Sequence, residues 1–301
     1  MRAVVIEEGR LVVAERADPV AGTGEVLIRV RAAGINNADL LQAAGKYPPP
    51  PGTPPDMPGL ECAGELVETG ERVMALLPGA GQAELVAVDA RHVLPVPEGV
   101  DWPAAGGFME TFATAHDALF TQAELRPGER LLVNGASGGV GTAAVQLGVA
   151  LGAEVTGTAR RAESRDLVRG LGADTEPEGE YDVILELVGG ELLTRDVERL
   201  ARHGRLAVIG TGAGARAQVD FGLLMRKRAR IHGSTLRARS AEEKALVVER
   251  LGEAALPLLA AGRVAVPVQE TFPLDQAQAA YAIFAAGGKF GKLVLVTRSP
   301  R

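Results

Sequence analysis

The residues with the clearest potential for chemistry form a glycine-rich run, Asn134–Gly141. The run follows an apolar strand-like segment, Arg130–Asn134, and precedes a helix-like segment, Val140–Leu151. In such a turn the backbone approaches a phosphate closely, and the amides and dipole at the helix start attract an anion. The run therefore predicts a site for the pyrophosphate of a dinucleotide, although Ala136 replaces the first glycine of the usual G-x-G-x-x-G pattern.

Two of the glycines have separate expected roles. Gly138 allows the close approach of backbone to pyrophosphate, and Gly141 lets the helix pack tightly on the strand. The alternative is a glycine-rich helix start that binds no ligand.

The end of the following strand, Glu154–Thr158, indicates which dinucleotide is bound. An NAD-binding domain normally places an acidic residue there to hold the ribose hydroxyls. This chain has Arg160 and Arg161 instead, and guanidinium groups match a phosphate dianion with forked donors. The pattern favours NADPH. The alternative is a solvated face on which the arginines pair with Glu163 and Asp166.

The elements around the turn alternate between strands and helices, which is typical of a doubly wound parallel sheet. A series of six strands is expected, with the glycine-rich turn after the first, and five of the six can be located in the sequence. The strand-like segments are 130–134, 154–158, 182–187, 205–209 and 230–233, and the helix-like ones are 104–123, 140–151, 162–171, 192–201, 220–226 and 241–261.

The first hundred residues are β-rich, with short apolar runs separated by Gly, Pro and acidic residues. A stiff loop at Tyr47–Pro58 contains seven prolines and is either functional or a plain connector. The tail returns to a strand, a helix at 274–286 and a strand at 292–296. We therefore expect two domains, one formed by residues 1–112 with 262–301, and the other by residues 113–261.

Composition excludes several classes of function. The 301 residues carry a formal net charge of −6 with a pI near 5.4, which argues against nucleic-acid and membrane-surface partners. The single cysteine excludes a disulfide framework. No signal peptide and no membrane span is expected. These features predict a soluble protein of a reducing compartment, the cytoplasm.

Several ordered motifs along the whole chain resemble one family. They are Gly34–Asp39, Gly45–Pro48, Pro58–Gly64, Gly70–Val73, the turn Ala136–Gly141 and the closing Gly288–Leu295. The sequence resembles the zinc-free, zeta-crystallin-like quinone oxidoreductase branch of the medium-chain dehydrogenase/reductase superfamily. The resemblance implies an α/β protein in which a Rossmann domain that binds NADPH is inserted in a β-rich, barrel-like (GroES-like) catalytic domain.

The resemblance also implies that no metal takes part. Alcohol dehydrogenases of the superfamily have a cysteine ligand where this chain has Asn36, and a His-Glu pair where it has Leu60-Glu61. The four-cysteine structural zinc lobe is absent. Cys62 is expected in the core, and the four histidines show no spacing typical of ligands.

Site residues follow from the resemblance, position by position. Asn36 and Tyr47 are the candidate catalytic residues, as donors to the oxygen on which negative charge develops. The alternatives are a helix cap for Asn36 and loop packing for Tyr47. Asp39 is expected to be structural. Lys292 matches a family lysine near the cofactor, although Lys289 is close enough to be confused with it. The candidate cofactor residues are Ser137, Gly138, Gly139, Val140, Gly141, Thr158, Arg160, Arg161, Gly210, Thr211, Leu236 and Lys292.

The predicted function is hydride transfer from NADPH to a quinone. The alternatives are reduction of conjugated enones or alkenals, and NADPH binding without catalysis. A short-chain dehydrogenase is excluded, because none of the three tyrosines is followed four residues later by lysine. The last strand of the sheet, 229–233, carries Ile231 at an unpaired edge, so a homodimer is expected.

Overall fold

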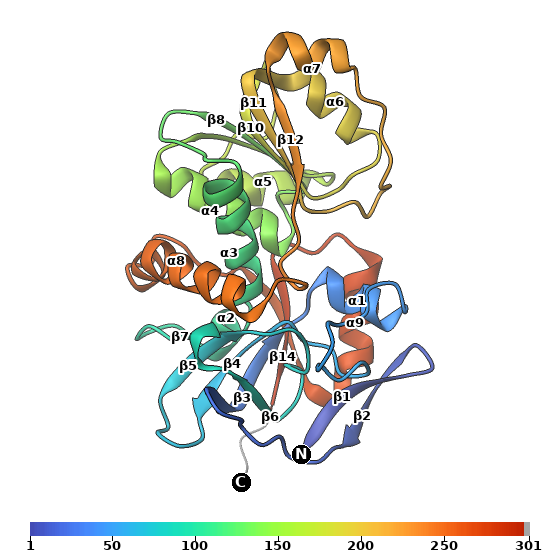
Figure 1. The fold of residues 1–301 in the computed structure, drawn as a ribbon, viewed down its shortest axis with the longest axis vertical. Coiled ribbons are helices and arrows are strands. Elements are labelled where there is room, and N and C mark those ends of the chain that lie inside the picture. The colour runs from blue at the N-terminus through green and yellow to red at the C-terminus, as the bar shows by residue number, and fades with distance from the viewer. Residues whose placement is uncertain (298–301) are drawn as a thin grey trace. The chain divides into compact units, whose positions relative to one another are not determined.

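The computed structural model describes residues 1–297, which divide into two compact units. The first, here the β-rich unit, comprises Met1–Ala113 and the chain from Leu236 onward, and the second, the parallel-sheet unit, comprises Thr114–Thr235. Figure 1 traces both along the chain. This is the expected combination of a GroES-like part and an inserted Rossmann-like sheet.

The division differs from the expected one at its second boundary, where residues 236–261 join the β-rich unit. The reason is the packing of α8 (Ala241–Ala260). His92 Nε2 lies 2.8 Å from the carbonyl oxygen of Ala241. A Cβ on Gly252 would lie 2.9 Å from Leu94, so the helix packs directly on the strand that contains Leu94, β7 (Val93–Pro95).

The β-rich unit is built on a seven-stranded sheet in the order β13-β14-β3-β4-β5-β7, with β6 also paired to β3. A separate hairpin joins β1 and β2. The strands are β1 (Arg2–Glu7), β2 (Arg10–Glu15), β3 (Glu25–Gly34), β4 (Glu61–Leu66), β5 (Arg72–Leu76), β6 (Leu85–Asp89), β7 (Val93–Pro95), β13 (Val268–Pro273) and β14 (Lys292–Val296).

The C-terminal segment completes this sheet. β14 pairs antiparallel with β3, with Val294 opposite Gly34, and parallel with β13. Leu293 and Leu295 then pack with Val4 and Ile35 in one buried cluster. The expected assignment of residues 262–297 to this domain is consistent with that pairing, and residues 298–301 lie outside the described part of the chain.

The helices of the β-rich unit are short except for α8. The sequence pattern predicts one helix over 104–123, but the structure has α2 (Trp102–Gly106) and α3 (Met109–His116). The last three residues of α3 and the π-helical turn that follows, Asp117–Gln122, already belong to the parallel-sheet unit. The break falls at Gly107 and Phe108, where the chain passes over Lys292. The other helical segments are α1 (Asn37–Ala43), α9 (Ala277–Ala286) and two 3₁₀ turns at Ala90–His92 and Leu274–Gln276.

The parallel-sheet unit has five strands, not six, in the order β12-β11-β10-β8-β9, all parallel. The place beyond β9 is taken only by an isolated bridge between Thr156 and Asp174, because residues 175–180, between this bridge and the next strand of the chain, form no strand. The strands are β8 (Arg130–Asn134), β9 (Glu154–Thr158), β10 (Tyr181–Glu186), β11 (Leu200–Val208) and β12 (Arg230–Gly233).

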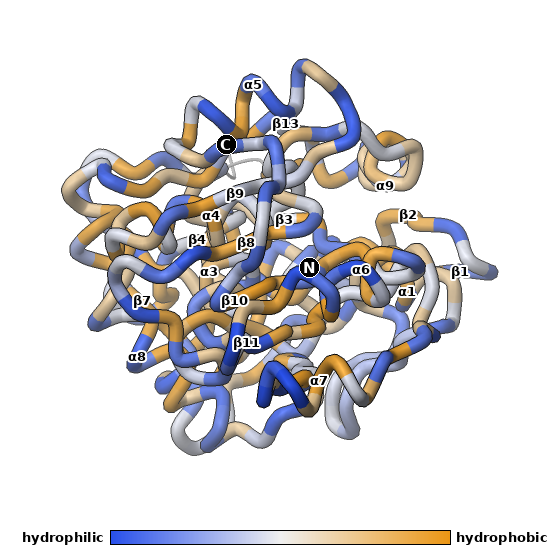
Figure 2. Tube along the Cα trace, turned by 90° about the horizontal axis from the view of Figure 1, so that it is seen from above, coloured by the Kyte–Doolittle hydropathy of each residue, from blue (hydrophilic) through white to orange (hydrophobic). Residues whose placement is uncertain are grey.

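Different helices pack on different strands of the parallel sheet. α4 packs on β8 and β9, whereas α6 and α7 pack on β10 and β11 (Figure 1). The tube of β10 is mostly hydrophobic in colour in Figure 2, as expected of a central strand covered on both faces. The helices are α4 (Gly139–Leu151), α5 (Ala162–Gly170), α6 (Leu192–Arg199) and α7 (Phe221–Lys227).

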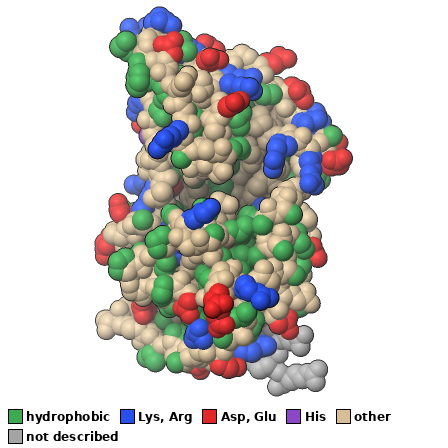
Figure 3. Space-filling model, turned by 90° about the vertical axis from the view of Figure 1, so that its right-hand side faces the viewer, with side chains coloured by type: hydrophobic (Ala, Val, Ile, Leu, Met, Phe, Trp, Pro, Cys, Tyr) green, Lys and Arg blue, Asp and Glu red, His purple; other side chains and the backbone are tan. Residues whose placement is uncertain are grey.

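Charge of both signs is spread over the surface. On the face drawn in Figure 3, Lys and Arg side chains stand among Asp and Glu side chains. The basic residues Arg226, Lys227 and Arg228 lie at the end of α7, where Lys227 donates to the carboxylate of Glu180 and to the carbonyl oxygens of Glu198 and Leu200. Within residues 1–297, no helix is long and apolar enough to cross a bilayer.

Candidate functional site

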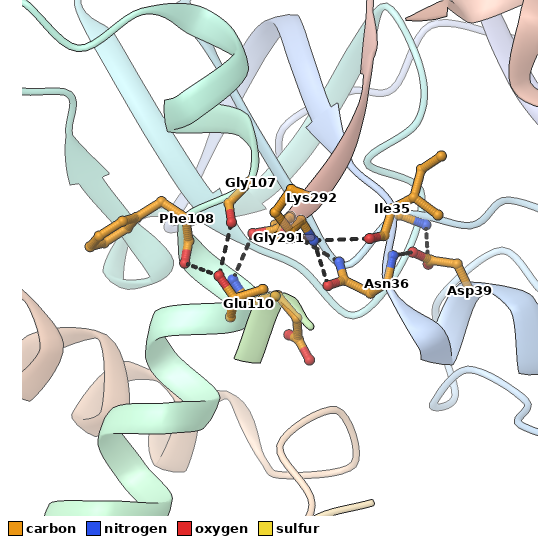
Figure 4. A network of polar contacts seen from close by, with 12 residues as sticks. Ile35, Asn36, Asp39, Gly107, Phe108, Glu110, Gly291 and Lys292 are labelled. Atoms are coloured by element: carbon orange, nitrogen blue, oxygen red, sulfur yellow. Dashed lines mark hydrogen bonds and ion pairs between the residues drawn. The ribbon is translucent and has the colours of Figure 1, made fainter. Parts of the chain in front are cut away.

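The β-rich unit contains a buried ion pair between Lys292 at the start of β14 and Glu61 at the start of β4. The Lys292 Nζ–Glu61 Oε1 distance is 2.6 Å, and the side chains are 2% and 0% exposed. Lys292 Nζ also donates to Asn36 Oδ1 (2.7 Å) and to the carbonyl oxygen of Ile35 (2.9 Å). Figure 4 shows Lys292 directed at Asn36. All three ammonium hydrogens are therefore engaged inside the unit.

The carboxylate of Glu61 is equally satisfied. Oε1 also accepts from Asn36 Nδ2 at 2.9 Å, and Oε2 accepts from the backbone N–H of Glu110 at 2.9 Å. A Cβ on Gly34 would lie 2.3 Å from Glu61 Oε1, so only glycine leaves room for this carboxylate. The network joins the N-terminal strands, α3 and the C-terminal tail in one buried polar contact.

Asp39 holds the start of α1 next to this network. Its carboxylate is inaccessible to solvent and accepts from the backbone N–H groups of Asn36 (2.8 Å) and Gly59 (2.9 Å). Burial raises the pKa of Asp39 to about 6, and the two backbone hydrogen bonds oppose that rise. These contacts agree with the structural role expected for Asp39.

Tyr47 opens the proline-rich loop, which is fixed by the buried guanidinium of Arg237. Arg237 Nη1 donates to the Tyr47 carbonyl oxygen (3.1 Å), Nη2 to Gln42 Oε1 (2.6 Å) and Nε to the Pro78 carbonyl oxygen (2.9 Å). The guanidinium carbon lies 5.4 Å from the centre of the Tyr47 ring. Burial raises the pKa of Tyr47, so the phenol remains a hydrogen-bond donor at neutral pH.

Two further titratable groups, Glu110 and Lys244, lie within electrostatic reach of Arg237. Burial, and then the negative charges of Glu61 and Asp39, raise the pKa of Glu110 to about 8. Burial lowers the pKa of Lys244, while Glu110 opposes that change. Glu110, Arg237 and Lys244 belong to no sequence motif, so the sequence alone does not predict a role for them.

The glycine-rich turn in the parallel-sheet unit has the geometry of an anion site. α4 begins after Gly138 with no side-chain cap, and no described residue bonds the backbone N–H groups of Gly139, Val140 and Gly141. A Cβ on Gly138 would meet nothing closer than 3.6 Å, whereas one on Gly141 would lie 2.3 Å from the Gly135 carbonyl oxygen. The turn is therefore open at Gly138 and closely packed at Gly141, which fits a pyrophosphate at the free amides.

Arg160 and Arg161 follow β9 and are exposed. The described residues offer neither side chain a hydrogen bond or an ion pair. Asp166, one of the expected partners, instead binds Arg169 at 2.6 Å. The two guanidinium groups are thus available to a ligand.

A buried polar cluster of Asn134, Glu186 and Asp196 holds the first residue of the turn, and the sequence did not predict it. Asn134 Nδ2 donates to Glu186 Oε2 and Asp196 Oδ1, each at 2.8 Å. Burial and then the neighbouring Glu186 raise the pKa of Asp196 to about 8. Glu186 also accepts from the backbone N–H groups of Val188 and Gly189. The only sequence feature that points to this cluster is Glu186, an acidic residue at the end of an apolar strand.

The other predicted cofactor residues of this unit lie at the carboxyl ends of strands. Thr158 ends β9, and its Oγ1 donates to Asn134 Oδ1 at 3.1 Å, which ties it to the turn. Gly210 and Thr211 follow β11, and a Cβ on Gly210 would lie 2.4 Å from the Leu187 carbonyl oxygen. Ser137 is part of the turn itself. This edge is where open α/β sheets bind their ligands.

Two predicted cofactor residues lie in the β-rich unit instead. Leu236 is 7% exposed and is the first residue of the returning chain. Lys292 has the buried structural contacts described above. Lys289 is the less enclosed of the two lysines, with Nζ bonded to the Gly291 carbonyl oxygen and 4.3 Å from the centre of the Phe284 ring.

Cys62 lies in β4 at 0% exposure, and burial raises its thiol pKa well above the usual range. No group of three or more His, Cys, Asp and Glu side chains that could hold a metal ion occurs within residues 1–297.

Comparison with known proteins gives two matching family models. A zinc-binding dehydrogenase model matches residues 156–295, and an alcohol dehydrogenase GroES-like domain model matches residues 22–98. The quinone oxidoreductase of Mus musculus is 30% identical, over 92% of this chain and 91% of its own length.

Solved structures agree with this assignment. The quinone oxidoreductase of Thermus thermophilus, also solved in complex with NADPH, is 35% identical with a TM-score of 0.88, over 98% of this chain and 100% of its own. The CurK enoyl reductase is 25% identical with a TM-score of 0.80, over 96% of this chain and 95% of its own. Similarity extends to much longer proteins: the chain spans 4% of polyketide synthase GfsB of Streptomyces halstedii and 13% of NorB of Streptomyces orinoci.

The buried ion pair generates the first prediction. Lys292→Met leaves Glu61 buried without its counter-charge, and we expect this to lower the free energy of unfolding by about 3–5 kcal/mol. The double variant Glu61→Gln with Lys292→Met should recover more than half of the loss, because no net charge stays buried. Urea unfolding followed by circular dichroism measures both.

Lys289→Met is the matched control, since that lysine makes one backbone hydrogen bond and no ion pair; about 1 kcal/mol of loss is expected. Equal losses for the Lys292 and Lys289 variants would contradict the role assigned to the ion pair.

Proposed function

Since the chain belongs to the quinone oxidoreductase-like branch of the medium-chain dehydrogenase/reductase superfamily, an oxidoreductase family whose members bind nicotinamide cofactors, we propose that it reduces quinones with NADPH. The observation that carries the proposal is the pairing of an open, uncapped glycine-rich turn with two unpartnered arginines after β9. When bound, NADPH supplies a hydride to an electrophilic acceptor.

The residues proposed to hold the dinucleotide belong to the parallel-sheet unit. The free amides of Gly139 and Val140 suit the pyrophosphate, and Ser137 and Thr158 add hydroxyls beside the turn. Arg160 and Arg161 suit the 2′-phosphate that distinguishes NADPH from NADH. Gly210 and Thr211 complete the same strand-end edge of this unit.

Tyr47 is proposed as the main donor to the acceptor. Its phenol is half-buried, no described residue bonds it, and its pKa is raised, so it stays protonated. A donor at a carbonyl oxygen stabilises the negative charge that develops there during hydride transfer. Asn36 keeps one amide hydrogen beyond that given to Glu61, and it is the second donor. Water then supplies the proton that completes the hydroquinone.

The proposed chemistry requires no metal. The amide of Asn36 and the carboxylate of Glu61, at two positions where the resemblance places zinc-site residues in alcohol dehydrogenases, are bound to Lys292 and to each other. An ammonium group beside these side chains opposes the binding of a second cation there. Quinones need little further activation because they delocalise the incoming charge.

A second candidate function is reduction of an alkene conjugated to a carbonyl. The likeness to the CurK enoyl reductase favours it, and the electronic demand is the same, since charge again develops on a carbonyl oxygen. Both activities suit a protein of a reducing compartment, and we propose the cytoplasm, because the lone cysteine is buried and unpaired.

The dinucleotide preference is tested by removing both strand-end arginines. We expect Arg160→Ala with Arg161→Ala to weaken NADPH binding by one to two decades, about 1.5–3 kcal/mol, and to leave NADH binding nearly unchanged. Fluorescence titration of both dinucleotides measures this. Arg169→Ala, which removes an arginine of α5 already paired with Asp166, is the control. Equal binding of NADPH and NADH by the unaltered protein would refute the preference.

The reaction is tested by NADPH oxidation against small quinones, enones, ketones and alcohols, with a chelator present. We expect quinones or enones to be reduced and simple ketones and alcohols to be poor substrates. Tyr47→Phe should lower kcat about tenfold, because one hydrogen bond to the developing charge is lost. Tyr181→Phe, a tyrosine whose hydroxyl bonds Thr156 in the core, should not change kcat.

Tight NADPH binding with no turnover of any acceptor would instead support the alternative of a non-enzymatic NADPH-binding protein. Efficient ethanol oxidation without reduction of quinones or enones would contradict both candidate reactions.

We also propose a homodimer formed through β12. Within the described chain this strand pairs only with β11, and Ile231 on it is 38% exposed. Such an edge favours pairing with a second copy. Light scattering at micromolar concentration should give twice the chain mass, and Ile231→Lys should shift it toward the monomer. Leu167→Lys, on α5, is the control. A monomeric mass for the unaltered protein would contradict the proposal.

A further inference from the structure

The β-rich unit contains a pocket of about 730 Å³ next to the loop that carries Tyr47. Pro50, Pro51 and Thr53 of that loop line one part of it, and the N-terminal end of α8 lines another. Tyr47 itself is not part of the lining. The Arg237 side chain lies between the two, because it donates to the backbone carbonyl oxygen of Tyr47 and to that of Pro78, which lines the pocket.

Lys244 lines this pocket, and its environment is unusual for a lysine. It is 4% exposed, and the structure gives its ammonium neither a hydrogen bond nor an ion pair among the described residues. A buried ammonium normally has partners, because loss of hydration is costly. Glu110 is the carboxyl group within electrostatic reach, but it forms no ion pair with Lys244.

The position of Lys244 on its helix adds to the cost. It is the fourth residue of α8, whose first turn is capped by Ser240 and Glu243. The positive end of a helix dipole disfavours a cation and favours an anion. Glu242 and Glu243 of the same turn are exposed and lie outside the lining, so the helix end and the ammonium are the charges that α8 presents to the pocket.

The acidic side chains of the lining do not neutralise this charge. The Asp89 carboxylate is bound by Arg91, with Nη2 at 2.6 Å, and this contact lowers the pKa of Asp89 to about 2. Glu25 is exposed, and its carboxylate accepts from the backbone N–H of Gly22 at 2.8 Å. His92 Nε2 is hydrogen-bonded to the carbonyl oxygen of Ala241.

We propose that Lys244 binds an anionic group, a carboxylate or a phosphate, carried by the acceptor on the side away from its reacting carbonyl. The inference rests on the proposed reductase function and narrows its substrates to acceptors with a negatively charged substituent. The anionic group of the ligand forms the ion pair that Lys244 lacks among the described residues. Tyr47 and Lys244 then contact opposite ends of one substrate.

The test compares a naphthoquinone that carries a propanoic acid chain with its methyl ester. The two methylenes insulate the ring, so the two acceptors have nearly equal electrophilicity and differ in charge. We expect the acid to have a KM about tenfold lower than the ester, and Lys244→Met to bring the ratio to about one. Lys244→Arg should retain the preference, because it keeps the charge.

Arg91→Gln is the matched control, since Arg91 lines the same pocket but is already paired with Asp89. Its KM ratio should remain that of the unaltered protein. Inorganic phosphate should compete with the acid and not with the ester. Phosphate binding that Lys244→Met abolishes, without any preference for the acid, would assign the pocket to free anions and overturn the substrate inference.

A binding measurement separates this inference from the proposed function. Calorimetric titration of the acid into the protein without dinucleotide should show binding that Lys244→Met weakens about tenfold. If the ester is reduced as well as the acid, the inference fails and the reductase function stands. If neither is reduced but the acid binds through Lys244, the reductase function fails and the anion site stands.

Discussion

The β-rich unit depends on one buried ion pair, Lys292 with Glu61. Two charges without solvent are stable only when every donor and acceptor is used, and here Asn36, the Ile35 carbonyl oxygen and the Glu110 N–H complete the set. The pair fixes the first residue of β14 against β3 and β4, so the C-terminal strand can take only this register. The same contacts fix Asn36 and the start of α3, and the candidate site is built around them.

The fold could be predicted from the sequence because its signals are local. Alternating apolar runs marked the strands, and the glycine-rich turn marked the start of α4 within one residue. The expected elements differ from the observed ones where tertiary packing determines the local structure. The break at Gly107 lies against the side chain of Lys292, which is far away in the sequence, and the segment expected to add a sixth strand pairs only through a single bridge at Asp174. Helix α8 joins the β-rich unit through contacts with His92 and Leu94.

For the candidate site, the sequence supports a prediction only where a motif is present. Backbone amides at Gly139 and Val140 follow from glycine spacing, and the arginines follow from the absence of an acid after β9. The partners of Asn36 could not be predicted, since Glu61 and Lys292 are 25 and 256 residues away. Lys292 was expected near the cofactor, and its hydrogen bonds give it a structural role that its place in a motif did not reveal. Arg237, Glu110 and Lys244 carry no sequence signal at all.

The distribution of charge separates two uses of lysine in one unit. Lys292 has three acceptors, one of them a carboxylate, so its charge holds strands together. Lys244 is nearly as buried but has none of these, and among the described residues only the electrostatic influence of Glu110 opposes the cost of its burial. An apolar residue of similar length at this position would give the folded protein a higher stability, because no charge would be buried. Its place on the wall of a pocket, beside Pro50 and Pro51 of the loop that Tyr47 begins, is the reason for proposing that an anionic ligand provides the missing negative charge.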